Sequence, residues 1–369
     1  MLRTEWRGAL GPFLGKPGLY PKVSIELMIA AKATETVCFF MLLQEQRSLP
    51  RATSLGLAGC LTRYMAMTKT LNSANDNGLA AKPAAKDQSY FVKGGAVGVL
   101  LIHGLCGTPS EMRYVANGLA QQGYTVSCPQ LAGHCGTAEE MKAATWEDWY
   151  CSAEAALADL RERCDTVIVG GLSTGALLSL LLAARNPDQV QGLTLLAPTL
   201  WVNGWNIPWY MRLFKLIPSR RLANLINLPD RFPHGIKCER VRKFFADALF
   251  GGDQAGAGLP HTPGGAALEH RRLGKFVKAR LGEIAQPTLI LHPREDDLAD
   301  INNSWYLQRA MKGIVELVAL NDSYHNVTLD KQRQLVVDRV KAFIAGVTGA
   351  CALDQSRMPG RSGLRSAVA

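Results

Sequence analysis

The chain has 369 residues, of which 47% are hydrophobic and 20% are charged, so it can bury a sizeable core and is not globally disordered. A net charge of +10 would fit a nucleic-acid or anionic membrane partner, but residues 95–345 carry 26 Lys and Arg against 24 Asp and Glu. The basic excess therefore lies at the two ends, and we expect a nearly neutral globular body that does not bind nucleic acid.

Residues 1–88 are expected to form a basic, poorly structured N-terminal extension and linker. They show no clear helical or strand period, and residues 72–86 are rich in Asn, Ala, Gly, Lys and Pro. The most apolar stretch, residues 23–43, is interrupted by three charged residues, which argues against a membrane helix. Because no continuous apolar segment is followed by a small-residue cleavage site, we expect no secretory signal.

From residue 97 onward, short apolar runs alternate with amphipathic segments. The apolar runs predict strands at residues 97–102, 125–128, 166–169, 193–196, 288–291 and 315–320. The amphipathic segments predict helices at residues 111–122, 146–163, 175–185, 303–311 and 335–344. Thr145-Trp-Glu-Asp148 resembles a capping box for the second helix. This alternation predicts an α/β fold with a mostly parallel central sheet and helices on both faces.

The alternation breaks at about residues 199–284, a segment too long for a simple crossover between two strands. Its first part is aromatic, with Trp201, Trp205 and Trp209, and residues 215–243 are rich in Arg and Lys. We interpret this segment as a lid inserted between two strands of the sheet.

The end of the chain changes texture again. Residues 346–369 are rich in Gly, Ser and Arg and are expected to form a disordered tail. This leaves residues 89–345 as one domain that contains the lid.

Cysteine usage and the short motifs make a metal or cofactor site improbable on the sequence alone. Nine cysteines, an odd number, show neither a CxxC pair nor the Cys/His spacing of a metal site. Most stand in apolar settings, where a reduced thiol packs as a small hydrophobe, so a reducing cytoplasm fits best. Residues 170–175 lack the second Gly of a GxGxxG motif because Leu172 stands there. We expect no metal and no cofactor.

The sharpest local signal is Gly171-Leu-Ser-Thr-Gly175, which lies between a predicted strand and a predicted helix. A nucleophile elbow has this arrangement, because Gly on either side of a strained turn lets the Ser hydroxyl stand above the sheet edge. The alternative is an ordinary Gly-rich turn. The strand before and the helix after it favour the elbow, and they predict Ser173 as a nucleophile.

Acyl transfer also needs N–H donors for an oxyanion, and a base for the nucleophile. The loop His103-Gly-Leu-Cys-Gly107 follows the first strong strand, so we expect the donors to be the amides of Leu105 and Thr174. His103 is expected to support this loop. His325 is the histidine that follows the last predicted strand, which is the position of the base when the chain order is Ser, acid, His.

With these residues in place, residues 95–345 resemble the bacterial carboxylesterase and monoacylglycerol lipase family of α/β-hydrolases. The resemblance rests on these motifs: His103-Gly-Leu-Cys-Gly-Thr-Pro109 with Met112, Gly123-Tyr-Thr-Val126, Pro129-Gln-Leu-Ala-Gly-His134, Thr145-Trp-Glu-Asp-Trp149, Gly171-Leu-Ser-Thr-Gly175, and Ser323-Tyr-His325 through Thr328-Leu-Asp330. It implies the α/β-hydrolase fold, ester hydrolysis without a cofactor, and Asp296 as the triad acid.

The chain departs from the family pattern beside the nucleophile and the Gly-His motif. Cys135 and Ala176 stand where the family usually has Gly, and Thr174 replaces a frequent Met. These small changes bear on substrate preference and leave the type of reaction intact.

Several carboxylates compete for the role of the acid, because residues 294–300 contain Glu295, Asp296, Asp297 and Asp300. The resemblance favours Asp296. Asp297 would need the opposite side-chain direction, and Asp300 lies far enough along to cap the following helix.

The resemblance implies short to medium acyl esters or monoacylglycerols as small-molecule substrates. The aromatic side chains of Trp201, Trp205 and Trp209 are candidates for binding an apolar acyl chain, although an aromatic face packed within the lid explains them equally well. An acyl thioesterase that uses the basic lid to meet phosphates is the alternative enzyme. A catalytically silent binding protein is the alternative outside enzymes, and weak contact with a lipid surface and the oligomeric state stay open.

Overall fold

The computed structural model describes residues 87–251 and 254–357, all within residues 57–369, one of two compact units of the chain. The extension expected at residues 1–88 lies outside the described residues, apart from Asp87 and Gln88.

A seven-stranded sheet forms the centre of this unit, in the order β1-β3-β2-β4-β5-β8-β9. Only β1 among these strands is antiparallel to its neighbour. The strands span β1 Tyr90–Val92, β2 Val97–Ile102, β3 Thr125–Cys128, β4 Thr166–Leu172, β5 Gly192–Leu196, β8 Thr288–Pro293 and β9 Val315–Leu320. Most are continuous Val, Leu and Ile runs buried on both faces, as strands of a covered parallel sheet must be.

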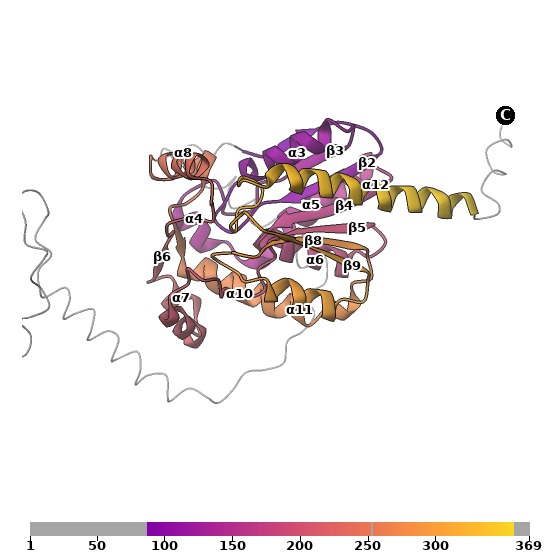
Figure 1. Cartoon of the computed structure of the whole chain (residues 1–369). Coiled ribbons are helices and arrows are strands. Elements are labelled where there is room, and N and C mark those ends of the chain that lie inside the picture. Colours follow the sequence, from indigo (N-terminus) through magenta and orange to yellow (C-terminus); the bar gives the residue numbers. More distant parts are fainter. Residues whose placement is uncertain (1–86, 252–253, 358–369) are drawn as a thin grey trace, which may run out of the picture. The chain divides into compact units, whose positions relative to one another are not determined.

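Helices cover both faces of the sheet (Figure 1). Along β2, Leu100 and Ile102 belong to one apolar core, and Val99 and Leu101 belong to the other, because successive side chains of a strand point to opposite faces. The first core includes residues of α5 (Trp146–Arg163), α6 (Thr174–Arg185), α10 (Gly264–Lys278) and α11 (Asn302–Ala310). The second includes residues of α3 (Arg113–Ala120) and α12 (Arg333–Arg357). The predicted fold class is therefore confirmed.

Two helices begin with reciprocal caps that the sequence encodes locally. Thr145 Oγ1 accepts a hydrogen bond from Asp148 N at 3.3 Å, and Asp148 Oδ2 accepts one from Thr145 N at 2.8 Å, so the predicted capping box of α5 is confirmed. Thr137 and Glu140 form the same box at α4 (Ala138–Ala143).

The segment between β5 and β8, which contains the insertion at residues 199–284, is not uniform. Most of its elements lie together at one end of the sheet (Figure 1). They are η3 (Trp209–Leu216), α7 (Arg220–Ala223), β6 (Asn227–Pro229), α8 (Glu239–Phe250), α9 (Gln254–Ala257) and β7 (His261–Pro263), followed by η4 (Leu281–Glu283) after α10. β6 and β7 pair antiparallel with each other. Helix α10 differs, because Ala266, Leu273 and Val277 are buried in the core that α5 and α6 share.

Several elements differ from the sequence analysis, among them β1, β4 and α12. The antiparallel strand β1 was not predicted, because three residues are too few to show a period. Strand β4 continues past residue 169 through Gly170 and Gly171, which pair with β2 although glycine has low strand propensity. Helix α12 continues to Arg357, so the predicted tail is wrong over residues 346–357, and residues 358–369 lie outside the described residues. Val347 is buried against the second core, a contact that the sequence pattern did not show.

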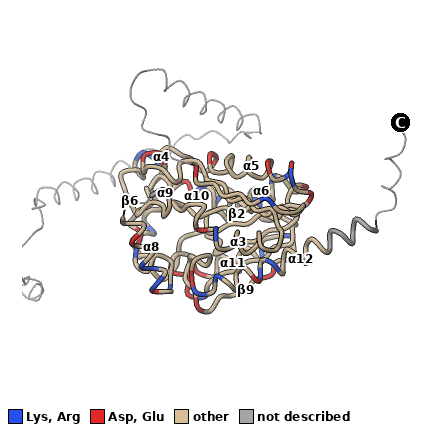
Figure 2. The backbone as a smooth tube through the Cα atoms, turned by 90° about the horizontal axis from the view of Figure 1, so that it is seen from above, with Lys and Arg blue, Asp and Glu red and all other residues tan. Residues whose placement is uncertain are grey.

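Charged residues of both signs are spread over the described part of the chain (Figure 2). Figure 2 shows Lys and Arg interspersed with Asp and Glu around the described part of the chain. No helix within that part combines the length and the apolar character that crossing a bilayer requires.

Candidate active site

The residues singled out from the sequence lie where neighbouring parallel strands end. Ser173 follows β4, the loop with Asp296 follows β8, and His325 lies beyond β9. The loop of residues 103–107, hereafter the oxyanion loop, follows β2. Since these strands are parallel, their carboxyl ends lie at the same edge of the sheet, which is where open α/β sheets bind ligands.

Ser173 occupies a strained turn between β4 and α6. Its φ of 56° and ψ of −110° lie in a region that non-glycine residues rarely adopt. Gly171 and Gly175 flank it, and a Cβ atom at either position would overlap the carbonyl oxygen of Ile102 at the end of β2. A Cβ atom on Gly171 would also overlap the backbone of Gly175. The two glycines therefore allow the elbow to pack against β2.

Replacing Gly175 with alanine should destabilise the protein by about 1–3 kcal/mol or more, because the added methyl group meets rigid backbone rather than a movable side chain. Gly282→Ala is a matched control, since nothing lies within 4 Å of a Cβ atom there and the expected change is within about 0.5 kcal/mol. Denaturant unfolding of both variants measures the difference. Equal stability of Gly175→Ala and the wild type would contradict this account of the elbow.

His325 and Asp296 form a buried hydrogen-bonded pair. The imidazole Nδ1 lies 3.0 Å from Asp296 Oδ1 and 2.9 Å from Oδ2. Because a carboxylate only accepts hydrogen bonds, Nδ1 carries the proton and Nε2 presents its lone pair. Nε2 is buried and has no hydrogen-bond partner among the described residues. His325 is thus held in the tautomer that a general base requires.

The Ser173 hydroxyl is bonded elsewhere in this structure. Ser173 Oγ donates to Thr199 Oγ1 at 3.2 Å, and Thr199 Oγ1 donates to the carbonyl of Ala197 at 3.1 Å. Catalytic hydrogen bonds often form only when substrate is bound. In this structure Ser173 Oγ and His325 Nε2 do not bond each other.

The groups around Asp296 stabilise its ionised form. Its Oδ1 accepts hydrogen bonds from Leu298 N at 2.9 Å and Ala299 N at 2.8 Å. Burial favours the neutral acid, but the charge and hydrogen bond of His325 outweigh it, and the pKa of Asp296 is lowered. In the same way, burial opposes the His325 cation, but Asp296 outweighs burial and raises the pKa of His325.

The neighbouring carboxylates have other partners. Asp297 Oδ2 accepts from Gly235 N at 3.0 Å, and Oδ1 accepts from the backbone N of His325 at 3.3 Å. Asp300 Oδ1 accepts from Asn302 N, the first residue of α11, at 3.0 Å. Glu295 Oε2 bonds Lys237 Nζ at 2.8 Å. Of the four acidic residues, Asp296 is the one whose carboxylate lies beside the imidazole of His325.

A second histidine, His292, stands behind the pair and was not singled out from the sequence. It is fully buried on β8, and Nε2 donates to Ala299 O at 2.8 Å while Ser304 Oγ donates to Nδ1 at 2.7 Å. Nε2 also lies 3.4 Å from Asp296 Oδ2. Its place in an apolar strand gave no sign of this contact, which depends on the turn of residues 293–299.

The oxyanion loop is held from two sides. His103 is fully buried, with Nδ1 donating to Gly104 O at 2.9 Å and Nε2 accepting from Leu131 N at 3.3 Å. Burial lowers the pKa of His103 to about 4, so the ring is neutral, and its expected supporting role is confirmed. From the other side, Leu259 N in the insertion donates to Cys106 O at 3.1 Å. Leu105, half-buried, lies between these two anchors.

Thr174 begins α6 directly after Ser173, so its amide lies beside the nucleophile. Its hydroxyl lies 2.9 Å from Nδ1 of His270, which is buried on α10. Burial is the main cause that lowers the pKa of His270 to about 4. The sequence showed Thr174 as a departure from the family, and its partner could not be found without the tertiary contact.

The three tryptophans of the insertion do not gather in one place. Trp201 packs its ring against Tyr306 of α11, with centroids 5.4 Å apart. Trp205 Nε1 donates to Glu295 O at 3.0 Å, and its ring lies 5.5 Å from that of Tyr324, so it touches the loops that carry Asp296 and His325. Trp209 is 75% exposed in η3.

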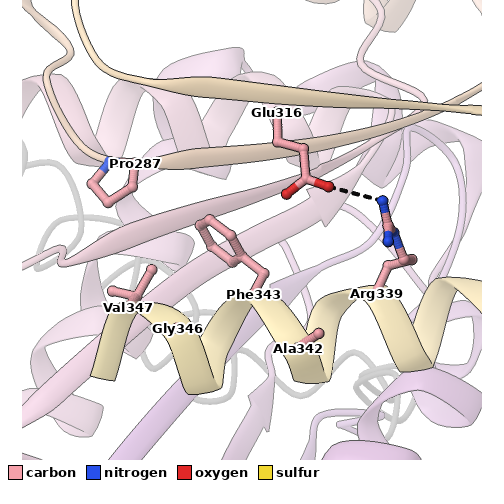
Figure 3. Close-up of a pocket in the computed structure, with 7 residues that line it drawn as sticks. All are labelled: Pro287, Glu316, Arg339, Ala342, Phe343, Gly346 and Val347. Carbon is pink, nitrogen blue, oxygen red and sulfur yellow. Dashed lines mark hydrogen bonds and ion pairs between the residues drawn. The ribbon is translucent and has the colours of Figure 1, made fainter. Parts of the chain in front are cut away.

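A shallow hollow elsewhere on the surface is lined by none of the site residues predicted from the sequence. It lies between the start of β8 and β9 and the middle of α12, with Phe343 inside it and an ion pair of Glu316 and Arg339 at 2.9 Å beside it (Figure 3). Since it borders the amino ends of these strands, it is at the opposite edge of the sheet from Ser173.

Comparison with known proteins gives consistent matches over the described domain. The family model described as Hydrolase_4, serine aminopeptidase, S33, matches residues 96–332. A thermostable monoacylglycerol lipase of Bacillus sp. (strain H-257) is 30% identical over 263 residues, which cover 71% of this chain and 96% of that protein. A carboxylesterase of Bacillus subtilis (strain 168) is 24% identical over 262 residues, covering 69% and 95%. A solved structure from work on the metagenome-derived lipolytic enzymes LipS and LipT is 30% identical, with a TM-score of 0.60, and covers 72% of this chain and 98% of that chain.

Proposed function

Since the chain belongs to the Hydrolase_4 (serine aminopeptidase, S33) family of α/β-hydrolases, we propose that it hydrolyses carboxylic esters through Ser173, Asp296 and His325. The observation that carries this proposal is the buried pair of His325 and Asp296, which leaves Nε2 unprotonated at the sheet edge where Ser173 stands. The matched relatives are a monoacylglycerol lipase and a carboxylesterase, which supports monoacylglycerols or short to medium acyl esters as the small-molecule substrates.

The proposed reaction has two stages. His325 Nε2 takes the proton of Ser173 as Oγ attacks the ester carbonyl carbon, and Asp296 stabilises the imidazolium that forms. The amides of Leu105 and Thr174 donate to the oxyanion. Collapse of the tetrahedral intermediate releases the alcohol, which takes the proton from His325. Water, deprotonated by His325, then attacks the acyl-enzyme and releases the carboxylic acid.

The exposed side chains of the insertion support an apolar substrate. Large hydrophobic residues there are strongly exposed, among them Trp205, Trp209, Leu213 and Leu225. Their exposure leaves apolar side chains of this segment available to an apolar ligand or partner. Trp205 is the best placed of the three tryptophans to contact an acyl chain, because it lies against the loops of Asp296 and His325.

A substrate panel tests the function and separates it from thioester hydrolysis. We expect p-nitrophenyl esters of increasing acyl length and monoacylglycerols to be cleaved with higher kcat/KM than the matching acyl-CoA thioesters. One arginine of the insertion is already engaged, because Arg220 donates to the carbonyls of Lys142 and Ala144 instead of facing a phosphate. Faster cleavage of acyl-CoA would make the protein a thioesterase, and no cleavage of any acyl substrate would leave only a binding role.

A further inference from the structure

Glu111, in the short helix η2 (Pro109–Met112) that follows the oxyanion loop, is a buried carboxyl group that the proposed reaction does not use. Its Oε2 accepts a hydrogen bond from Gly104 N at 3.2 Å. A Cβ atom on Gly107 would overlap both carboxylate oxygens, so the carboxylate also lies directly against that residue. Glu111 therefore contacts the oxyanion loop near both of its ends.

The contact with Gly104 bears on the geometry of the proposed oxyanion donor. Gly104 has no side chain to restrict its backbone, and glycine adopts many conformations. Here its N–H is held by Glu111 and its C=O by Nδ1 of His103 at 2.9 Å. The C=O of Gly104 and the N–H of Leu105 belong to one rigid peptide group, which His103 holds, and the N–H of Gly104 belongs to the preceding peptide group, which Glu111 holds. The two side chains together therefore restrict φ and ψ of Gly104 and fix the direction of the Leu105 N–H.

Glu111 also lies close to the reacting groups. A Cβ atom on Gly104 would be 3.6 Å from Glu111 Oε2 and 3.8 Å from Ser173 Cβ, so the carboxylate and the nucleophile flank the same residue. Burial is the main cause that raises the pKa of Glu111 from 4.5 to about 7, while the Gly104 N–H and the charge of His325 oppose it. Its charge in turn helps, after Asp296 and Asp297, to raise the pKa of His325.

The other titratable groups around these two residues come from several elements. Asp230, after β6, adds to the raised pKa of Glu111, and the thiols of Cys106 and Cys135 lie within its electrostatic reach. Around His325 the further groups are His270 on α10 and His292 on β8, whose lowered pKa values keep both rings neutral.

We propose that Glu111 is a positioning residue, which holds the N–H of Gly104 and, together with His103 on the C=O of Gly104, fixes the direction of the Leu105 N–H. This rests on the proposed ester hydrolysis, because the peptide matters only if Leu105 receives an oxyanion.

The variants Glu111→Gln and Glu111→Ala test this positioning. The glutamine oxygen can still accept from Gly104 N–H, so we expect kcat at pH 8 within about tenfold of the wild type. The alanine variant has no acceptor, so kcat should fall by about 10²-fold, the loss expected for a misplaced oxyanion donor, with a much smaller change in KM. Glu269→Gln is the matched control, since Glu269 is also buried but bonds Trp146 N and Arg272, and its kcat should equal that of the wild type.

A stability measurement tests the carboxyl group without using activity. Because the folded-state pKa of Glu111 is raised, its contribution to stability is fully present below pH 4.5 and is lost as the pH rises to about 7. The melting temperature of the wild type minus that of Glu111→Gln should therefore fall over this range. A kcat of Glu111→Ala within about tenfold of that of Glu111→Gln would overturn the proposal. A difference in melting temperature that does not vary with pH would show that the buried carboxyl group does not titrate in this range. Loss of ester hydrolysis in the wild type itself would instead overturn the proposed function, and the melting curves would still decide the charge of Glu111.

Discussion

Replacing Ser173 with alanine is expected to abolish measurable ester hydrolysis and to leave the protein folded. Removing the nucleophile of a serine protease costs about 10⁶-fold in kcat, because no other group can form the acyl-enzyme. The side chain contributes little to stability, since its one hydrogen bond, to Thr199 at 3.2 Å, is worth about 1 kcal/mol. Hydrolysis of a p-nitrophenyl ester and labelling with a fluorophosphonate measure the effect.

The matched control for this variant is Ser179→Ala. Ser179 is also buried on α6, and its hydroxyl donates within the helix to Gly175 O at 2.8 Å, away from His325. It should retain both hydrolysis and labelling. Fluorophosphonate labelling that persists in Ser173→Ala would show that another residue is the nucleophile.

Asp296→Asn is expected to reduce kcat by about 10⁴-fold, the loss that follows in the serine-protease template when the acid becomes an amide and the imidazole is held in the wrong tautomer. The carboxylate accepts both from His325 Nδ1 and from the amides of Leu298 and Ala299. An asparagine can use its oxygen for the amides, but its NH₂ group then faces His325 and forces the proton onto Nε2. The kcat of purified variants measures this, with circular dichroism as the control for folding.

Asp297→Asn and Asp300→Asn are the comparison variants, and both should change kcat by less than about tenfold, or ~1.4 kcal/mol in the barrier. Asp297 accepts from two backbone amides, so its variant should lose stability, by about 1–3 kcal/mol, while the imidazole keeps its partner. A loss of several orders of magnitude at Asp297 or Asp300, with Asp296→Asn active, would mean that the acid is misassigned.

The parts of the fold that were predictable from the sequence are those whose signal is local. The apolar runs at residues 97–102, 125–128 and 315–320 match β2, β3 and β9 residue for residue. The pattern is clearest for β2, because a strand covered on both faces must be continuously apolar. Strand β1 and the end of α12 were missed. Their places depend on contacts with β3 and with the second core, which a local pattern does not contain.

The candidate site likewise has features that the local sequence predicts and features that it does not. The elbow around Ser173 is a five-residue pattern, and it could be found because Gly171 and Gly175 are adjacent to it in the chain. The choice among the acidic residues of the loop 294–300 needed the family resemblance, because Asp296 and Asp297 differ only in the direction of their side chains. The contact of Glu111 with Gly104 and the contact of His270 with Thr174 could not be predicted, because each forms only in the folded chain.

The insertion is fastened to the body on both sides of the candidate site. Gly235 N bonds the carboxylate of Asp297, Asn206 N bonds the carbonyl of the same residue at 3.1 Å, and Leu259 N bonds Cys106 O in the oxyanion loop. An exchange of this segment with that of a relative would therefore disturb both the loop of residues 294–300, which carries Asp296, and the oxyanion loop. We therefore expect that single substitutions within the segment, with its anchoring residues retained, change the substrate preference of this protein with less loss of activity than an exchange of the whole segment does.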